Sequence, residues 1–179
     1  MKKLPLNSIL SFVATGITFI VDTILLTLVK KATHPNGGVA VVRIDAIGDF
    51  ILWLDAAKEF RKLYPYKKLT LVANKSWANL ATLLPYWDEV LSIDRKKLIR
   101  NPFYRLQTLL QIRRQRFETV IQPTLSREFL YGDSLVRMSG APIRIASEGD
   151  LSNMTRWEKA ISDRWFSKLV PASRKPLME

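Results

Sequence analysis

The sequence contains no cysteine among its 179 residues. Disulfide frameworks, thiol nucleophiles and cysteine-based zinc sites are therefore excluded, and a reducing compartment is compatible with the composition. Acidic residues are also scarce, since 16 Asp and Glu face 28 Lys and Arg and the formal net charge is +12. A balance this basic favours an anionic partner, whether a nucleic acid, a membrane surface or a phosphorylated substrate.

Histidine is nearly absent, and the single copy, His34, falls in the polar segment 32–38, where we expect it to be solvated. The sequence has no internal repeat and no low-complexity tract. RNP, KH and zinc-finger patterns are missing, and the aromatic residues do not form a stacking platform, which disfavours a nucleic-acid-binding protein. The length is enough for one domain and marginal for two.

The segment 4–29 is mostly apolar and is long enough to cross a hydrocarbon core of about 30 Å as a helix. Asp22 interrupts it and would cost about 2.5–3.5 kcal/mol near the bilayer centre. Three interpretations compete: a spanning anchor, a helix lying in the interface and a cleaved signal peptide, of which the last lacks an A-x-A cleavage site. We predict that residues 1–38 are a membrane-anchor helix and a linker. Lysines flank both ends, so they do not decide its orientation.

The rest of the chain alternates short apolar runs with amphipathic segments. The runs interpreted as strands are residues 39–44, 68–73, 89–93, 118–122 and 143–146. The segments interpreted as helices are residues 50–64, 76–84, 94–117 with a break near Asn101, 125–139 and 157–170. This alternation predicts an α/β fold with a parallel sheet flanked by helices, preceded by the N-terminal hydrophobic helix.

The turn after the first strand is the main candidate site. It reads Asp45-Ala46-Ile47-Gly48-Asp49 and leads into the helix that starts at Phe50. In an open α/β sheet this turn faces the crevice where ligands bind. Gly48 allows a sharp turn or the close approach of a ligand, and Asp49 stands where an N-cap belongs. Asp49 is therefore either only a helix cap or a general base facing a hydroxyl acceptor.

The segment 94–117 is strongly basic, and a single acid, Asp94, opposes its cations. Such a run is either a solvated helix face or a surface for anions such as lipid headgroups or the phosphates of an acceptor glycolipid. The cations are Arg95, Lys96, Lys97, Arg100, Arg105, Arg113, Arg114 and Arg116.

Residues 41–50, Val-Val-Arg-Ile-Asp-Ala-Ile-Gly-Asp-Phe, resemble the N-terminal signature of glycosyltransferase family 9, the heptosyltransferase family of lipopolysaccharide assembly. Agreement continues at Trp77 and in five further stretches, whose order and spacing together are specific. These are residues 84–90, 120–127, 132–137, 139–141 and 149–153. The resemblance covers residues 39–170.

The resemblance implies half of a GT-B enzyme, in which two Rossmann-like domains enclose the active site between them. Residues 39–170 would be the Rossmann-like acceptor domain, and residues 171–179 a linker toward a C-terminal donor domain that is missing from this sequence. No cofactor and no metal are implied. The nucleotide-sugar donor is a co-substrate, and its site would be in the missing domain.

Site residues also follow from the resemblance. The family's Gly-Asp aspartate, the base proposed to deprotonate the acceptor hydroxyl, matches Asp49 and favours its catalytic interpretation. Polar residues in matching motifs or at the open ends of predicted strands are candidates for acceptor binding, although such residues are also typical of caps and turns. These candidates are Arg43, Gly48, Ser126, Arg127, Asp133 and Asn153.

We therefore expect the acceptor-binding half of an inverting, heptosyltransferase-like enzyme that is inactive on its own. Its acceptor would be a lipid-linked or lipopolysaccharide-type glycolipid. Its place would be the cytoplasmic face of the bacterial inner membrane, attached through the N-terminal segment. The alternatives are a non-catalytic module that binds a membrane or glycolipid and, less favoured, a basic nucleic-acid-binding domain.

Overall fold

The computed structural model describes residues 6–29 and 35–171. The chain divides into two compact units, Met1–Lys31 and Ala32–Glu179. The predicted linker histidine, His34, and most of the predicted linker 171–179 lie outside the described residues.

The first unit contains one helix, α1 (Leu6–Leu28). Its threonines are accommodated by hydrogen bonds within the helix, because Thr18 Oγ1 donates to the Ala14 carbonyl at 2.8 Å and Thr23 Oγ1 to the Phe19 carbonyl at 2.7 Å. Over residues 6–29 and 35–171, no helix is sufficiently long and apolar to cross a membrane.

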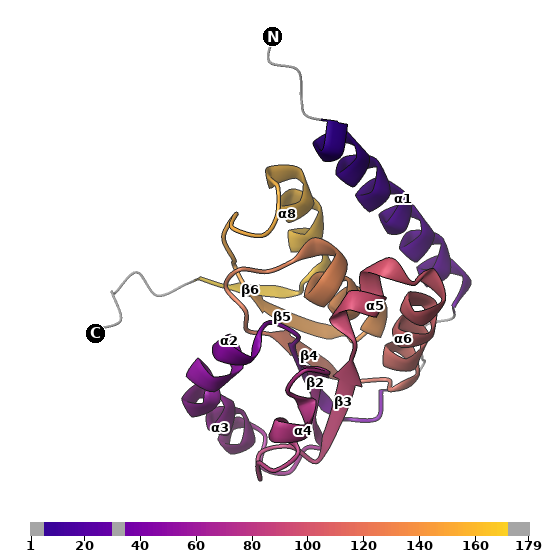
Figure 1. Cartoon of the computed structure of the whole chain (residues 1–179). Helices are drawn as coiled ribbons and strands as arrows, with labels where there is room; N and C mark the ends of the chain where they lie inside the picture. The colour runs from indigo at the N-terminus through magenta and orange to yellow at the C-terminus, as the bar shows by residue number, and fades with distance from the viewer. Residues whose placement is uncertain (1–5, 30–34, 172–179) are drawn as a thin grey trace. The chain divides into compact units, whose positions relative to one another are not determined.

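The second unit is built on a six-stranded sheet with the order β3-β2-β1-β4-β5-β6 (Figure 1). Every neighbouring pair is parallel, which confirms the predicted α/β fold with a Rossmann-like parallel sheet. The strands are β1 (Val39–Arg43), β2 (Leu69–Asn74), β3 (Glu89–Ile93), β4 (Thr119–Gln122), β5 (Ile143–Ser147) and β6 (Lys168–Val170).

Helical segments connect each strand to the next. They are α2 (Ile47–Leu52), α3 (Leu54–Leu63), α4 (Ala78–Ala81), α5 (Arg95–Arg100), α6 (Pro102–Arg114), η1 (Phe129–Asp133), α7 (Ser134–Ser139), α8 (Arg156–Ser162) and η2 (Asp163–Trp165). The helix predicted over 157–170 is wrong at its C-terminal end, because residues 168–170 form β6 and pair with β5. A three-residue strand is too short for its side-chain alternation to show in the sequence.

The core on one side of the sheet joins α2, α3 and α4 to β1 and β2. Every residue of β1 is buried, as expected for a strand that is covered on both faces. Phe50 stacks on Trp77 with ring centroids 4.0 Å apart, and Trp53 stacks on Trp87 at 5.9 Å. This packing holds the N-terminal end of α2 at the carboxyl end of β1.

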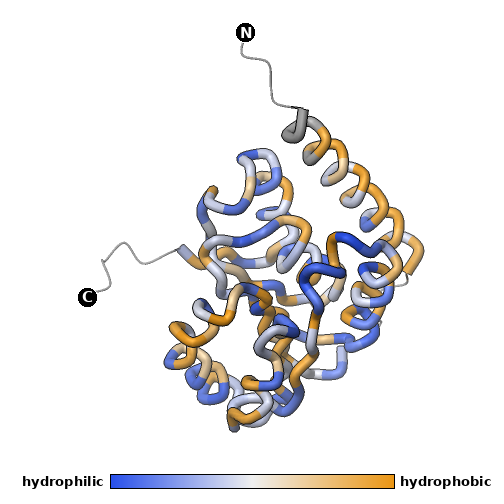
Figure 2. Tube along the Cα trace, in the orientation of Figure 1, coloured by the Kyte–Doolittle hydropathy of each residue, from blue (hydrophilic) through white to orange (hydrophobic). Residues whose placement is uncertain are grey.

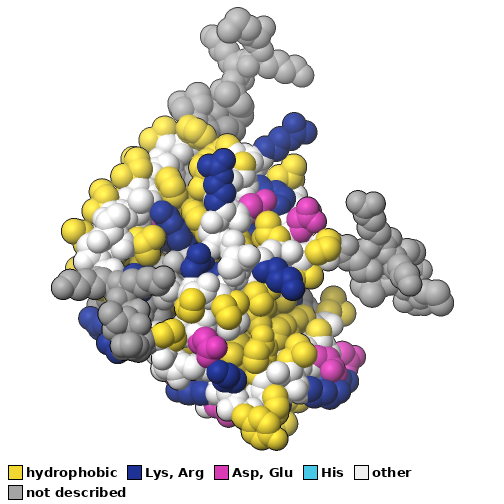
Figure 3. Space-filling view, turned by 180° about the vertical axis from the view of Figure 1, so that it is seen from behind, with side chains coloured by type: hydrophobic (Ala, Val, Ile, Leu, Met, Phe, Trp, Pro, Cys, Tyr) yellow, Lys and Arg dark blue, Asp and Glu magenta, His cyan; other side chains and the backbone are white. Residues whose placement is uncertain are grey.

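On the same side, β4 is buried but β5 and β6 are partly exposed. Ile143 and Ile145 of β5 share their face with Val170 of β6, because the strands pair in parallel. Ile143 is 42% and Val170 44% exposed, and a shallow cavity of about 290 Å³ lies against these strands. Figure 3 shows that apolar side chains gather into a broad patch on one face of the molecule.

The basic segment divides where the sequence predicts a break. Asp94 caps α5 by accepting from the Lys97 N–H, and Asn101 caps α6 by accepting from the Tyr104 N–H, both at 3.0 Å. Two of its cations are buried rather than exposed. Arg105 donates to the Leu130 carbonyl at 2.8 Å and Arg113 to the Met138 carbonyl at 3.4 Å. The segment is therefore not one charged face.

Candidate active site

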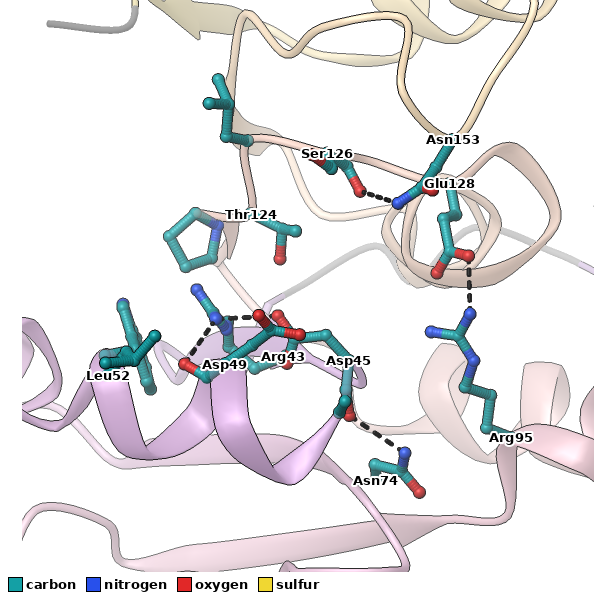
Figure 4. Close-up of a pocket in the computed structure, with 14 residues that line it drawn as sticks. Arg43, Asp45, Asp49, Leu52, Asn74, Arg95, Thr124, Ser126, Glu128 and Asn153 are labelled. Carbon is teal, nitrogen blue, oxygen red and sulfur yellow. Dashed lines mark hydrogen bonds and ion pairs between the residues drawn. The ribbon is translucent and has the colours of Figure 1, made fainter.

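A cavity of about 920 Å³ opens at the carboxyl ends of β1, β2 and β4, the edge where parallel sheets bind ligands. Figure 4 shows its two walls. The lower wall is the end of β1 with α2, and the upper wall is the segment after β4. The lining residues are Arg43, Asp45, Ala46, Asp49, Leu52, Trp53, Asn74, Arg95, Pro123, Thr124, Leu125, Ser126, Glu128 and Asn153.

Arg43, the last residue of β1, organises the lower wall. Its Nη2 lies 2.7 Å from Asp45 Oδ2 and donates to the Asp49 carbonyl at 3.1 Å. Its guanidinium also lies over the Trp53 ring, 4.9 Å from the centroid. Burial lowers the pKa of Arg43 and raises the pKa of Asp45, and the attraction between the two groups opposes both shifts.

Asp49 is not the N-cap, so this prediction is wrong. Helix α2 begins at Ile47 and its N-cap is Ala46, which is extended and makes no side-chain cap hydrogen bond. Asp49 therefore lies in the first turn, where the helix dipole favours a negative charge. Its side chain is exposed and lines the cavity, and none of the hydrogen bonds between described residues uses its carboxylate. The carboxylate is thus available to a ligand.

The upper wall carries hydrogen-bonding side chains. Asn153 Nδ2 donates to the Ser126 carbonyl at 3.1 Å, and Ser126 Oγ donates to Asp150 Oδ2 at 3.2 Å. Arg95 Nη2 lies 2.6 Å from Glu128 Oε1. The structure therefore brings together four of the predicted site residues, namely Asp49, Arg43, Ser126 and Asn153.

Arg127 and Asp133 do not reach this cavity, which corrects their prediction as acceptor-binding residues. Both side chains are completely buried. Arg127 forms an ion pair with Asp163, lies 3.6 Å from Asp133 Oδ2 and sits over the Phe166 ring. Because Ser126 and Glu128 flank Arg127 in the chain, the buried arginine supports the upper wall from behind.

Gly48 is exposed, does not line the cavity and lies inside α2, with no atom within 4 Å of the position that a Cβ would take. The explanation that it permits a sharp turn is therefore wrong, because its backbone is helical. We expect Gly48→Ala to raise the free energy of unfolding by up to about 1 kcal/mol through helix propensity. Urea unfolding measures this change, and a loss of stability would mean that the backbone here needs glycine.

Asp133 should make stability depend on pH. Burial raises its pKa to about 6 from 3.8, against the attraction of Arg127. Between these two pKa values the folded state keeps a proton that the unfolded state loses. The contribution of Asp133 to the free energy of unfolding therefore falls as the pH rises from about 4 to 7. The total decrease is about 3 kcal/mol. Urea unfolding at several pH values should show a flatter profile for Asp133→Asn. Parallel profiles would contradict this assignment.

Several lining residues were not predicted. Asn74 ends β2 and Arg95 follows β3, so their positions at strand ends were a usable signal. Asn74 donates to the Asp45 carbonyl at 3.0 Å and helps to hold the turn. Nothing in the sequence marked Glu128 as a site residue, because only the path of the chain after β4 brings it close to Arg95. Among the described residues, no cluster of side chains that could hold a metal ion is found.

Comparison with solved structures identifies the fold. A glycosyl transferase family 9 structure from Veillonella parvula matches 82% of this chain with a TM-score of 0.63 and 17% sequence identity. The ADP-heptose lps heptosyltransferase II of E. coli matches 76% with a TM-score of 0.56 and 13% identity. The fold is glycosyltransferase-like.

The chain spans 39% and 35% of the lengths of those two solved chains. No protein-family model and no curated protein matches the sequence. At these sequence identities the similarity establishes the fold alone. The chemistry open to the chain depends on the residues that line the cavity.

Proposed function

We propose that this chain is the acceptor-binding half of an inverting, heptosyltransferase-like glycosyltransferase. The observation that carries the proposal is the Asp49 carboxylate, which lines a cavity of about 920 Å³ without a hydrogen bond to another described residue. Such a group can accept a proton from a hydroxyl that a ligand presents to it.

The cavity lining suits a sugar-like acceptor. Trp53 contributes an aromatic side chain to the lining. Amide and hydroxyl groups come from Asn74, Thr124, Ser126 and Asn153. Binding sites for small molecules typically combine apolar surface with a few polar groups that fix the orientation of the ligand. The two arginines of the cavity are each paired with a carboxylate, Arg43 with Asp45 and Arg95 with Glu128. Hydroxyl recognition therefore fits this lining.

In the proposed reaction, Asp49 takes the proton of an acceptor hydroxyl. The oxygen attacks the anomeric carbon of a nucleotide sugar from the side opposite the diphosphate, so the new glycosidic bond forms as the bond to the diphosphate breaks, with inversion. The donor would be held by a second domain. The acceptor would be a lipid-linked or lipopolysaccharide-type glycolipid at the cytoplasmic face of the membrane, with residues 4–29 as the tether.

The test begins with the reading frame downstream of the Glu179 codon. A frame that continues into a second α/β domain defines a full-length polypeptide, which should transfer sugar from a labelled nucleotide sugar to bacterial glycolipid. The 179-residue chain alone should not, because transfer needs donor and acceptor oriented together. A stop codon directly after Glu179, or a full-length polypeptide without transfer, would favour the non-catalytic binding module instead.

A further inference from the structure

Within the second unit, the α5–α6 corner exposes three apolar side chains. Phe103 is 70%, Ile99 40% and Leu106 37% exposed. Phe103 and Leu106 are three residues apart on α6 and therefore share one face of that helix, and Ile99 lies in the last turn of α5, just before the corner.

Exposed cations lie on α5, the helix that leads into this corner. Lys96, Lys97 and Arg100 of α5 are all exposed, and the 23 residues from Arg95 to Phe117 contain no acid. The nearby Asp94 is occupied as the cap of α5. In Figure 2, α5 is drawn mainly in the hydrophilic colour. We call this surface, formed by Lys96, Lys97, Ile99, Arg100, Phe103 and Leu106, the α5–α6 patch.

We propose that the α5–α6 patch binds an anionic lipid surface. An interfacial segment combines exposed apolar side chains with lysine and arginine. The apolar groups enter the boundary between headgroups and acyl chains, and the cations meet anionic headgroups. A nucleic acid would use the cations but gain little from Phe103 and its apolar neighbours. The net charge of +12 adds a general attraction to the same surface.

Binding through the patch would also orient the candidate active site. Arg95, the first residue of α5, lines the cavity, and the patch begins at the next residue. The cavity rim would therefore lie close to the lipid surface, where a lipid-linked acceptor presents its sugar. The patch itself does not depend on the proposed reaction, and its test involves no sugar transfer.

The absence of cysteine allows a probe at a single position of the full chain. Phe103→Cys labelled with the environment-sensitive fluorophore NBD should gain fluorescence severalfold, with a blue shift, on vesicles of phosphatidylcholine and phosphatidylglycerol at 3:1. Pure phosphatidylcholine should have little effect. NBD at Tyr66→Cys and Leu83→Cys, positions 98% and 78% exposed outside the patch, should not respond.

A charge comparison completes the test. The triple variant Lys96→Gln, Lys97→Gln, Arg100→Gln should weaken docking of the patch on anionic vesicles, read from the NBD response at position 103, by about fivefold per cation removed, roughly 100-fold in all. The matched triple variant Arg114→Gln, Arg156→Gln, Arg164→Gln removes the same charge elsewhere and should stay close to the parent chain. Vesicle binding without a response at position 103, equal responses at all three probe positions, or displacement of the vesicles by duplex DNA would overturn the proposal.

Discussion

Replacing Asp49 with asparagine should lower kcat for sugar transfer by the full-length polypeptide by about 10²–10⁴-fold, because the amide cannot accept the hydroxyl proton. The fold should be nearly unaffected. Asp49 is exposed, is not the cap of α2 and makes no side-chain hydrogen bond to another described residue, so the loss is limited to its interaction with the helix dipole, less than about 1 kcal/mol. Acceptor binding should stay close to that of the parent.

The matched control for this substitution is Asp55→Asn. Asp55 is also an acid in the first turn of a helix, α3, but it lies outside the cavity and pairs with Lys58 at 2.9 Å. Its replacement should leave kcat within about twofold of the parent. The measurements are kcat and the thermal midpoint of the same preparations. Normal kcat for Asp49→Asn would remove the general base from the proposed reaction.

Replacing Arg127 with methionine should lower the free energy of unfolding by about 3–5 kcal/mol at pH 7, the usual cost of removing one partner of a buried ion pair. The Asp133 carboxylate is completely buried and lies 3.6 Å from the arginine that would be removed. Asp163 would lose its arginine as well, although Lys159 remains 2.8 Å from it. Methionine keeps the length and apolar contacts of the side chain, so the effect reports on charge rather than on volume.

Urea unfolding measures the Arg127→Met loss, and Lys62→Met is the matched control. Lys62 pairs with Glu59 at 2.8 Å on the surface, and exposed pairs contribute about 0–1 kcal/mol. Adding Asp133→Leu to Arg127→Met should recover part of the loss, because the buried carboxylate is then gone as well. An Arg127→Met loss no larger than that of Lys62→Met would show that the buried pair does not support the upper wall.

The general architecture was predictable from the sequence because a parallel sheet that is buried on both faces needs continuous apolar strands. The five strands predicted from apolar runs occur within about one residue of their expected bounds. Their carboxyl ends necessarily meet at one edge, where Arg43 and Asp49 were expected. The resemblance to glycosyltransferase family 9 added Ser126 and Asn153, and all four residues are found together around the cavity.

By itself, then, the sequence determined the order of the first five strands with the helices between them and the edge of the sheet that carries the candidate site, because both follow from local hydrophobic periodicity. It did not reveal β6. Only the tertiary structure decided which polar side chains face the cavity. Arg127 and Ser126 are adjacent in the chain, yet the first is completely buried against Asp133 and Asp163 while the second lines the cavity. The outcome depends on charges brought from η1 and η2, and no local pattern in the sequence contains those long-range contacts.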